Sequence, residues 1–300
     1  MSSTAAIRRL QDAFPTRCAA GAALADLSTW RIGGAAALLC RPEREEELAA
    51  MVALLREEEA AWWLVGAGSN LLFPDEGLDG VVLCPGRGMA WLEVDGTLLR
   101  AGAAAGAVEV CRRAAREGLA GLEFAGGIPG TVGGMVRMNA GAHGQDVAQV
   151  LSRVRLLELD GSLRWVPAAE LRLDYRRSPG LGSRLVVAAE FALAPDDPEA
   201  IRARMREMLE RRRASQPLQE ASCGSVFKRP ADDFPGRLIE AAGLKGTRVG
   251  GAVVSALHAN FIVNEGGATA RDVLELVALV KRTVRERFGV ELEEEFQHVR

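Results

Sequence analysis

The sequence is poor in lysine, tyrosine and histidine, and it contains no long apolar run. Lysine occurs only at Lys228, Lys245 and Lys281, so arginine supplies nearly all of the 37 basic residues. With 40 acidic residues the net charge is −3, which excludes the broad positive field of a nucleic-acid-binding protein. No segment approaches the roughly 18 apolar residues of a membrane span, and the N-terminus lacks the apolar core of a secretory signal. We therefore expect a cytoplasmic protein without membrane or nucleic-acid partners.

Cysteine is sparse as well. The five cysteines are scattered, no Cys-x-x-Cys pair occurs, and the three histidines do not stand at zinc-ligand spacing with them. We expect free thiols in a reducing compartment and no metal site.

Glycine, in contrast, is abundant and clustered. The 33 glycines exceed the about 21 expected at a usual 7%. In Gly66-Ala67-Gly68-Ser69-Asn70, glycine permits a positive φ and close backbone approach, and the two polar residues add donors that suit a pyrophosphate. Leu71 stands where a dinucleotide-binding fingerprint requires its third glycine, and no Walker motif occurs. The segment therefore indicates either an anion-binding turn of another kind or a simple turn.

A second glycine-rich stretch covers residues 126–144. It contains seven glycines interleaved with isoleucine, valine and methionine rather than with serine or lysine. This composition is typical of packed backbone rather than of a flexible linker. It predicts backbone wrapped around a large, flat, partly anionic ligand, or tight turns between short strands.

The remaining chain mixes helices and hairpins. Periodicity predicts amphipathic helices over 44–60, about 106–117 and about 197–213, and a helix that begins with a capping box at Thr269 and Asp272. Hairpins are expected at Asp95-Gly96 and Asp160-Gly161, a strand over 185–193, and a linker over 211–225. Because strands and helices do not alternate regularly, the pattern favours an α+β fold.

Several polar motifs are ambiguous by themselves. Tyr175-Arg176-Arg177-Ser178 fits a basic surface turn, and the loop around Ser225 fits either a proton donor beside cations or an incidental serine. His258 is compatible with a structural histidine or a base. The acidic residues 291–295 read as a solvated run, or as a strand that places Glu293 and Glu295 on one face.

In their order along the chain, these segments resemble the UDP-N-acetylenolpyruvoylglucosamine reductase family. The resemblance extends from about residue 27 to 297. It is carried by the following motifs: STWRIGG (28–34), GAGSNLL (66–72), GLEF (121–124), GGIPGTVGG (126–134), MNAGAHG (138–144), YRRS (175–178), CGSVFKRP (223–230), GLKG (243–246), HANFIVN (258–264) and LEEE (292–295).

The resemblance implies a two-subdomain FAD-binding fold of the vanillyl-alcohol-oxidase type with a C-terminal α+β substrate-binding lobe. The implied boundaries are 1–83 and 84–211 for the FAD-binding subdomains and 212–289 for the lobe, with the tail 290–300 returning to the first subdomain. Tyr175 is the single tyrosine, which matches the short form of the family without an extra tyrosine-bearing loop.

The resemblance also implies the chemistry. NADPH reduces tightly bound, non-covalent FAD, and the enolpyruvyl group of a UDP-sugar then receives the hydride in peptidoglycan precursor synthesis. Ser225 matches the proton donor, and Arg176 and Glu295 match the residues that stabilise the charged intermediate. The implied cofactor-binding residues are Arg31, Gly66, Ala67, Gly68, Ser69, Asn70, Leu71, Gly127, Ile128, Pro129, Gly130, Thr131, Gly133, Gly134, Asn139 and Gly141. The implied substrate-binding residues are Tyr175, Lys228, Arg229, Lys245, His258 and Asn260.

Some positions depart from the family pattern, and other functions stay open at this point. Arg229 replaces a usual asparagine, and Glu294 and Phe296 replace a usual proline and valine. The alternatives are a related FAD-dependent oxidase of an alcohol or hydroxy acid, a serine hydrolase using Ser225 and His258, and a non-catalytic flavin-binding module. We expect a monomer.

Overall fold

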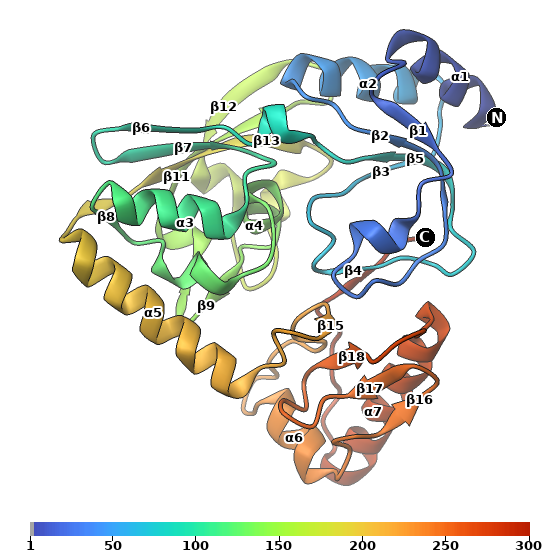
Figure 1. Cartoon of the computed structure of the whole chain (residues 1–300), viewed down its shortest axis with the longest axis vertical. Coiled ribbons are helices and arrows are strands. Elements are labelled where there is room, and N and C mark those ends of the chain that lie inside the picture. The colour runs from blue at the N-terminus through green and yellow to red at the C-terminus, as the bar shows by residue number, and fades with distance from the viewer. Residues whose placement is uncertain (1–2) are drawn as a thin grey trace. The chain divides into compact units, whose positions relative to one another are not determined.

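The computed structural model describes residues 3–300, which separate by contacts into two compact units (Figure 1). The first unit contains the described residues up to Ala19 together with Leu38–Ala67 and Gly80–Arg211. The second contains Ala20–Ala37, Gly68–Asp79 and Arg212–Arg300. The expected division at 83 and 211 with a returning tail stays a prediction.

The first unit contains two sheets. A four-stranded sheet has the order β1 (Cys18–Ala20), β2 (Ala36–Cys40), β5 (Leu78–Leu83) and β3 (Trp62–Leu64), and β3 and β5 run parallel. A five-stranded antiparallel sheet has the order β12 (Leu163–Pro167), β11 (Leu151–Leu157), β13 (Leu185–Ala192), β7 (Leu98–Gly102) and β6 (Leu92–Asp95). Both expected hairpins are present, since β6 joins β7 after Asp95 and β11 joins β12 around Gly161.

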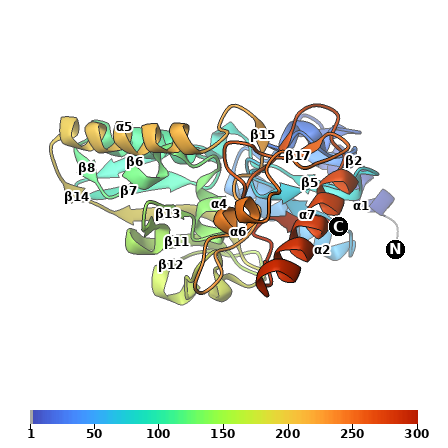
Figure 2. The same ribbon diagram turned by 90° about the horizontal axis from the view of Figure 1, so that it is seen from below.

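Helices cover these sheets. The helices of this unit are α1 (Ser3–Ala13), α2 (Glu45–Glu57), α3 (Ala107–Arg116) and α4 (Val132–Arg137), and α5 (Pro198–Ser215) begins in it. Helix α4 lies against β13 of the five-stranded sheet (Figure 2). Val110 of α3 and Val136 of α4 pack with Phe191 in one core on a face of this sheet. Val187, on the opposite face, joins the core of α1 and α2. Two short pairs complete the unit: β8 (Leu119–Ala120) with β14 (Ala194–Pro195), and β9 (Gly141–Ala142) with β10 (Gln145–Asp146).

The second unit is built around helix α7 (Ala270–Phe288). Thr269 and Asp272 form the expected capping box, and Gly289 ends the helix in the left-handed conformation. The helix packs with α6 (Pro235–Ala241) and a sheet of order β15 (Ala221–Ser222), β18 (Ile262–Asn264), β17 (Ala252–Val254) and β16 (Arg248–Val249). In addition, β19 (Gln297–His298) pairs in parallel with β4 (Leu71–Leu72).

The structure confirms the α+β class and the helix expected over about 197–213, and it corrects the start of the linker. The linker expected from residue 211 is helical as far as Ser215, where Arg212 and Gln216 are joined by backbone and side-chain hydrogen bonds. Within the glycine-rich stretch lies α4, which includes Gly133 and Gly134. Among the described residues, no helix is long and apolar enough to cross a membrane.

Candidate active site

The two glycine-rich segments meet in the first unit. A Cβ added to Gly66 would lie 2.5 Å from Oγ1 of Thr131, so glycine at this position permits the close approach. Thr131 precedes α4, and Gly130 before it has a φ of +153°. Residues 65 positions apart, which the sequence only suggested to share a ligand, are therefore neighbours.

The other half of the GAGSN turn belongs to the second unit. Gly68 has a φ of +59°, and an added Cβ would overlap the carbonyl oxygen of Leu27. The N–H of Thr29 donates to the Gly68 carbonyl (3.4 Å), while the Oγ1 of Thr29 is buried without a hydrogen-bond partner among the described residues. A buried, unsatisfied hydroxyl is costly unless a ligand or water supplies its partner. This turn therefore has the character of a binding site.

The Thr29 hydroxyl was not among the residues expected from the sequence. The signal was available, since Thr29 lies between Ser28 and Arg31 in the first motif, but only its packing against Gly68 shows the unmet hydrogen bond. Arg31 in the same motif is exposed and has a φ of +57°.

Asn139 holds loops in the first unit. Its side-chain NH₂ donates to Asp146 Oδ2 (3.2 Å) and to the Asp174 carbonyl (3.3 Å), and its Oδ1 accepts from the N–H of Ala148 (2.9 Å). At 2% exposure, this amide is engaged with protein partners. Its expected contact with a cofactor stays a prediction, and the hydrogen bonds show a positioning role.

Arg176 lies beside this region. Its backbone is left-handed, with a φ of +55°, and its Nη2 donates to the carbonyl of Gly141 (3.1 Å). The guanidinium also lies 5.0 Å from the ring centre of Tyr175, which is itself exposed. In addition, the Ser178 hydroxyl donates to the Val136 carbonyl (2.6 Å) and thereby ties the YRRS turn to α4. The half-buried guanidinium is thus held at a defined place.

Ser225 lies in the second unit, on a segment that Asn260 fixes. The side chain of Asn260 accepts from the Phe227 N–H (3.0 Å) and donates to the Phe227 carbonyl (2.9 Å), while its own carbonyl accepts from the Val226 N–H (2.9 Å). Asn260 is 6% exposed. The amide expected to bind substrate thus holds the backbone that follows Ser225.

The C-terminal tail runs against the same segment. The N–H of Glu295 donates to the Val226 carbonyl (2.8 Å), and the side chain of Asn70 donates to the Glu295 carbonyl (3.0 Å). Burial, and next the negative charge of Glu295, raise the pKa of the Cys223 thiol. The Glu295 carboxylate therefore interacts electrostatically with Cys223, two residues before Ser225. The expected continuous strand is instead a single bridge between Phe227 and Glu294, followed by β19.

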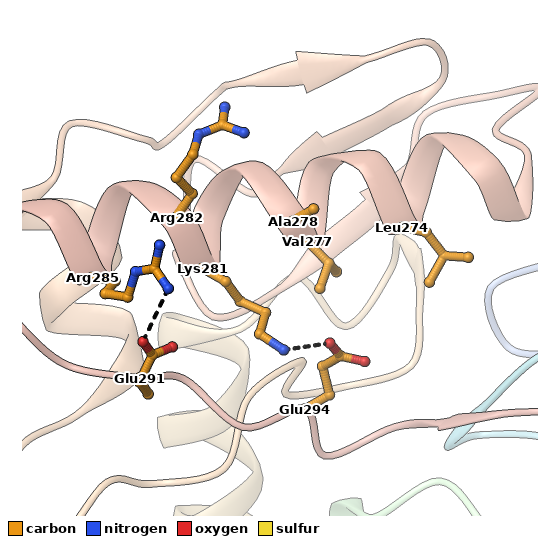
Figure 3. A pocket seen from close by; sticks show the side chains of 8 residues that line it. All are labelled: Leu274, Val277, Ala278, Lys281, Arg282, Arg285, Glu291 and Glu294. Atoms are coloured by element: carbon orange, nitrogen blue, oxygen red, sulfur yellow. Dashed lines mark hydrogen bonds and ion pairs between the residues drawn. The ribbon is translucent and has the colours of Figure 1, made fainter.

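The neighbouring glutamates of the tail bind cations. Glu293 pairs with Lys228, and Glu294 pairs with Lys281 (2.9 Å) and contacts Nε2 of His298 (2.6 Å). Although burial opposes the change, these two partners lower the pKa of the Glu294 carboxyl. The Lys281–Glu294 pair lies in a cavity of about 360 Å³ between α7 and the tail (Figure 3). None of the residues that line this cavity was expected from the sequence to belong to the active site.

The other expected substrate-binding residues of this unit lie near the surface. Arg229 stacks over Phe234 (4.8 Å), and Lys245 pairs with Glu240 (2.8 Å). Burial lowers the pKa of His258, and its Nδ1 accepts a hydrogen bond from the Asn260 N–H (3.2 Å). The backbone thus holds the imidazole through Nδ1, and the expected substrate contact of His258 stays a prediction.

The expected residues thus fall into two groups. In the first unit, Gly66 lies against Thr131, and Arg176 and Asn139 lie in the loops around Gly141. The second brings together Gly68, Asn70, Ser225, Asn260 and Glu295.

Arg212 adds a residue that sequence reasoning missed. Burial lowers the pKa of its guanidinium, and its Nη1 has no hydrogen-bond partner among the described residues. Arg212 falls where the expected helix (about 197–213) and the expected linker (211–225) overlap, and neither expectation indicates a buried guanidinium. Among the described residues, no group of three metal-binding side chains occurs.

Comparisons with known protein families match most of the chain. Residues 216–299 match the C-terminal domain of UDP-N-acetylenolpyruvoylglucosamine reductase, and residues 36–167 match an FAD-binding domain. The chain is 41% identical over 276 residues to a UDP-N-acetylenolpyruvoylglucosamine reductase of Bacillus velezensis, which covers 91% of each chain. It is 50% identical over 233 residues to a UDP-N-acetylenolpyruvoylglucosamine reductase of Symbiobacterium thermophilum, and this alignment covers 77% of this chain and 76% of the relative.

A solved structure is similar over nearly the whole length. The crystal structure of a UDP-N-acetylenolpyruvylglucosamine reductase from Thermus caldophilus matches with a TM-score of 0.82 and 38% identity. The match covers 93% of this chain and 98% of that chain.

Proposed function

Because the chain belongs to the UDP-N-acetylenolpyruvoylglucosamine reductase family, we propose that Ser225, Arg176 and Glu295 complete the reduction of an enolpyruvyl UDP-sugar. The chain is an FAD-dependent oxidoreductase of peptidoglycan precursor synthesis. The finer proposal is that NADPH is the reductant and that the enzyme works as a cytoplasmic monomer without nucleic-acid or membrane partners.

The residues present fit FAD. The glycine positions Gly66 and Gly68 leave no room for a side chain, and the buried Thr29 hydroxyl lacks a partner. A ligand with a diphosphate and polar ring edges supplies what such a turn needs, namely acceptors for backbone N–H groups and for a hydroxyl. Thr29, Gly66, Gly68 and Thr131 are the residues that we propose to hold it. Bound FAD supplies a two-electron carrier between NADPH and the enolpyruvyl double bond.

The chain's own contribution is charge stabilisation and proton transfer. Hydride addition to one carbon of the enolpyruvyl group places negative charge on the neighbouring carbon and its carboxylate. The guanidinium of Arg176, fixed by the Gly141 carbonyl, is suited to oppose that charge. The Ser225 hydroxyl then donates its proton to the charged carbon, and Glu295 orders the charged groups around this step.

One observation carries the assignment within the second unit. The tail that bears Glu295 is hydrogen-bonded to Val226, the residue next to Ser225, so the two proposed groups share one backbone contact. Asn260 holds the same segment from the other side of the chain. Proton transfer requires a donor held at a defined place, and these hydrogen bonds provide it.

The test separates the two half-reactions of the holoenzyme under anaerobic conditions. In Ser225→Ala, NADPH should bleach the flavin at the normal rate, while reoxidation by the enolpyruvyl UDP-sugar should slow by about 10²–10⁴-fold. Ser222→Ala, in the nearby strand β15, is the matched control and should leave both rates unchanged. Equal loss of both half-reactions would mean that Ser225 is structural. A flavin that NADPH leaves oxidised would favour the alternative, a related oxidase.

Glu295→Gln tests the choice among the tail carboxylates. We expect substrate reduction to slow in this variant and to stay normal in Glu293→Gln, because Glu293 is exposed and pairs with Lys228. A normal rate in Glu295→Gln would refute the assignment of Glu295.

A further inference from the structure

Two cysteines face each other on neighbouring strands of the first unit. The backbone bonds from Arg41 N–H to the Arg17 carbonyl and from Gly21 N–H to the Ala37 carbonyl set an antiparallel register for β1 and β2. This register places Cys18 opposite Cys40, and their Sγ atoms are 3.0 Å apart. Residues facing each other between such bonded positions have Cα atoms about 4.5 Å apart, which lies within the range that a disulfide spans.

The two thiols differ in environment. Cys40 is fully buried in the core of α1 and α2, whereas Cys18 is partly exposed on a strand at the edge of the sheet. A hydrogen bond between the thiols lowers the pKa of Cys18 and raises that of Cys40. Cys84, Cys111 and Cys223 are buried, and burial raises the pKa of each. Cys18 is thus the thiol best suited to react first.

We propose that Cys18 and Cys40 are a modification site, at which a hydroperoxide converts the facing thiols into a reversible disulfide. The Cys18 thiolate attacks the terminal peroxide oxygen and the O–O bond breaks. The other oxygen is protonated and leaves as water from hydrogen peroxide, or as an alcohol from an organic hydroperoxide. Cys18 is then a sulfenic acid, oxidised by two electrons. Cys40 attacks the Cys18 sulfur, the S–O bond breaks, and a water molecule leaves. A dithiol reductant reverses the reaction.

The proposed disulfide would enclose the segment that connects the two visits of the chain to the first unit. The chain leaves the first unit after Ala19 and returns to it at Leu38. The segment between them carries Thr29, which the proposed function assigns to cofactor binding, and Arg31, which the family resemblance implies for the same role. A Cys18–Cys40 bond would close this segment into a covalent loop and restrict its unfolded conformations. The proposed disulfide itself does not depend on the proposed function.

The sequence allows a direct test by peptide mapping. Trypsin cleaves after Arg17 and Arg31 but not between Arg41 and Pro42, so Cys18 and Cys40 fall in separate peptides, 18–31 and 32–44. The reduced full-length holoenzyme is treated with stoichiometric hydrogen peroxide and alkylated with N-ethylmaleimide in denaturant. It is then digested with trypsin, and the peptide masses are measured by mass spectrometry. We expect the two peptides to appear mainly as one linked species, which a dithiol reductant abolishes. Cys84, Cys111 and Cys223 should carry the maleimide.

Two variants sharpen the result. Cys40→Ser should leave Cys18 as a sulfenic acid that dimedone captures, whereas Cys84→Ser should leave the linked species unchanged. Three results in the native chain would overturn the proposal: Cys18 oxidised to sulfinic acid while Cys40 still takes maleimide, Cys18 linked to a different cysteine, or both thiols unreacted at a peroxide dose that oxidises free cysteine.

Discussion

The buried carboxylate of Glu190 provides a quantitative test of the five-stranded sheet. Glu190 is 2% exposed and lies opposite Arg100 of β7 and Arg153 of β11 in the strand register. Both oxygens of the carboxylate accept from Arg153 (2.8 and 2.7 Å), and one also accepts from Arg100 (2.7 Å). Arg153 first, and then Arg100, lower the pKa of Glu190 from 4.5 to about 2 against the opposing effect of burial.

The lowering of the Glu190 pKa sets the stability loss expected in Glu190→Gln. At about 1.4 kcal/mol per pKa unit, the lowered value corresponds to about 3 kcal/mol of folding stability at pH 7. Both guanidinium groups are partly exposed, at 29% and 44%, so solvent screening reduces the expected loss in Glu190→Gln to about 2 kcal/mol. Because the folded pKa is the lower one, the stabilisation is complete above pH 4.5 and is lost as the pH falls toward 2.

Urea unfolding followed by circular dichroism at pH 7, 5 and 3 measures this effect. The free energy of unfolding should differ by about 2 kcal/mol between native chain and variant at pH 7 and 5, and the difference should shrink at pH 3. Glu117→Gln is the matched control, because its pair with Arg113 on α3 is exposed and worth less than about 0.5 kcal/mol. A Glu190→Gln difference independent of pH would refute the electrostatic explanation.

Two further predictions concern backbone and capping. Gly68→Ala should abolish or strongly weaken FAD retention, because the added Cβ overlaps the Leu27 carbonyl. Gly96→Ala is the control: Gly96 has a similar φ of +58° and open space around it, so this variant should retain FAD. Equal FAD retention in both variants would contradict the close-packing argument. Thr269→Ala should lower the free energy of unfolding by about 1 kcal/mol through loss of the capping box of α7. Thr269→Ser should restore most of that stability. An unchanged urea midpoint in Thr269→Ala would contradict the capping role of Thr269.

Local sequence signals predicted local structure well. The capping box at Thr269 and the hairpin after Asp95 each depend on a few adjacent residues, and both are present as expected. The helix expected over about 197–213 is present as α5 and ends at Ser215, where Arg212 and Gln216 are hydrogen-bonded.

The site residues show where sequence reasoning stops. The roles that motif order implied for Ser225 and Asn260 stay predictions. It did not indicate that the Asn260 amide holds the backbone of Phe227, a residue 33 positions away. The unsatisfied hydroxyl of Thr29 likewise depends on packing against Gly68, which no local pattern encodes. Long-range contacts decide whether a polar group is free for a ligand.

The pairing of β4 with β19 has a consequence for synthesis on the ribosome. Leu71 and Leu72 receive their strand partner only when Gln297 and His298 emerge, among the last residues of the chain. At about 5–20 residues per second, the segment around β4 waits on the order of ten to forty seconds for that partner. During this time Trp30, which is fully buried in the finished protein, lacks the core residues that the chain supplies between Cys223 and Phe296. The indole of Trp30 therefore stays without its packing partner Phe296, whose ring centre is 5.1 Å away in the finished protein, until the segment that leads into β19 has been synthesised.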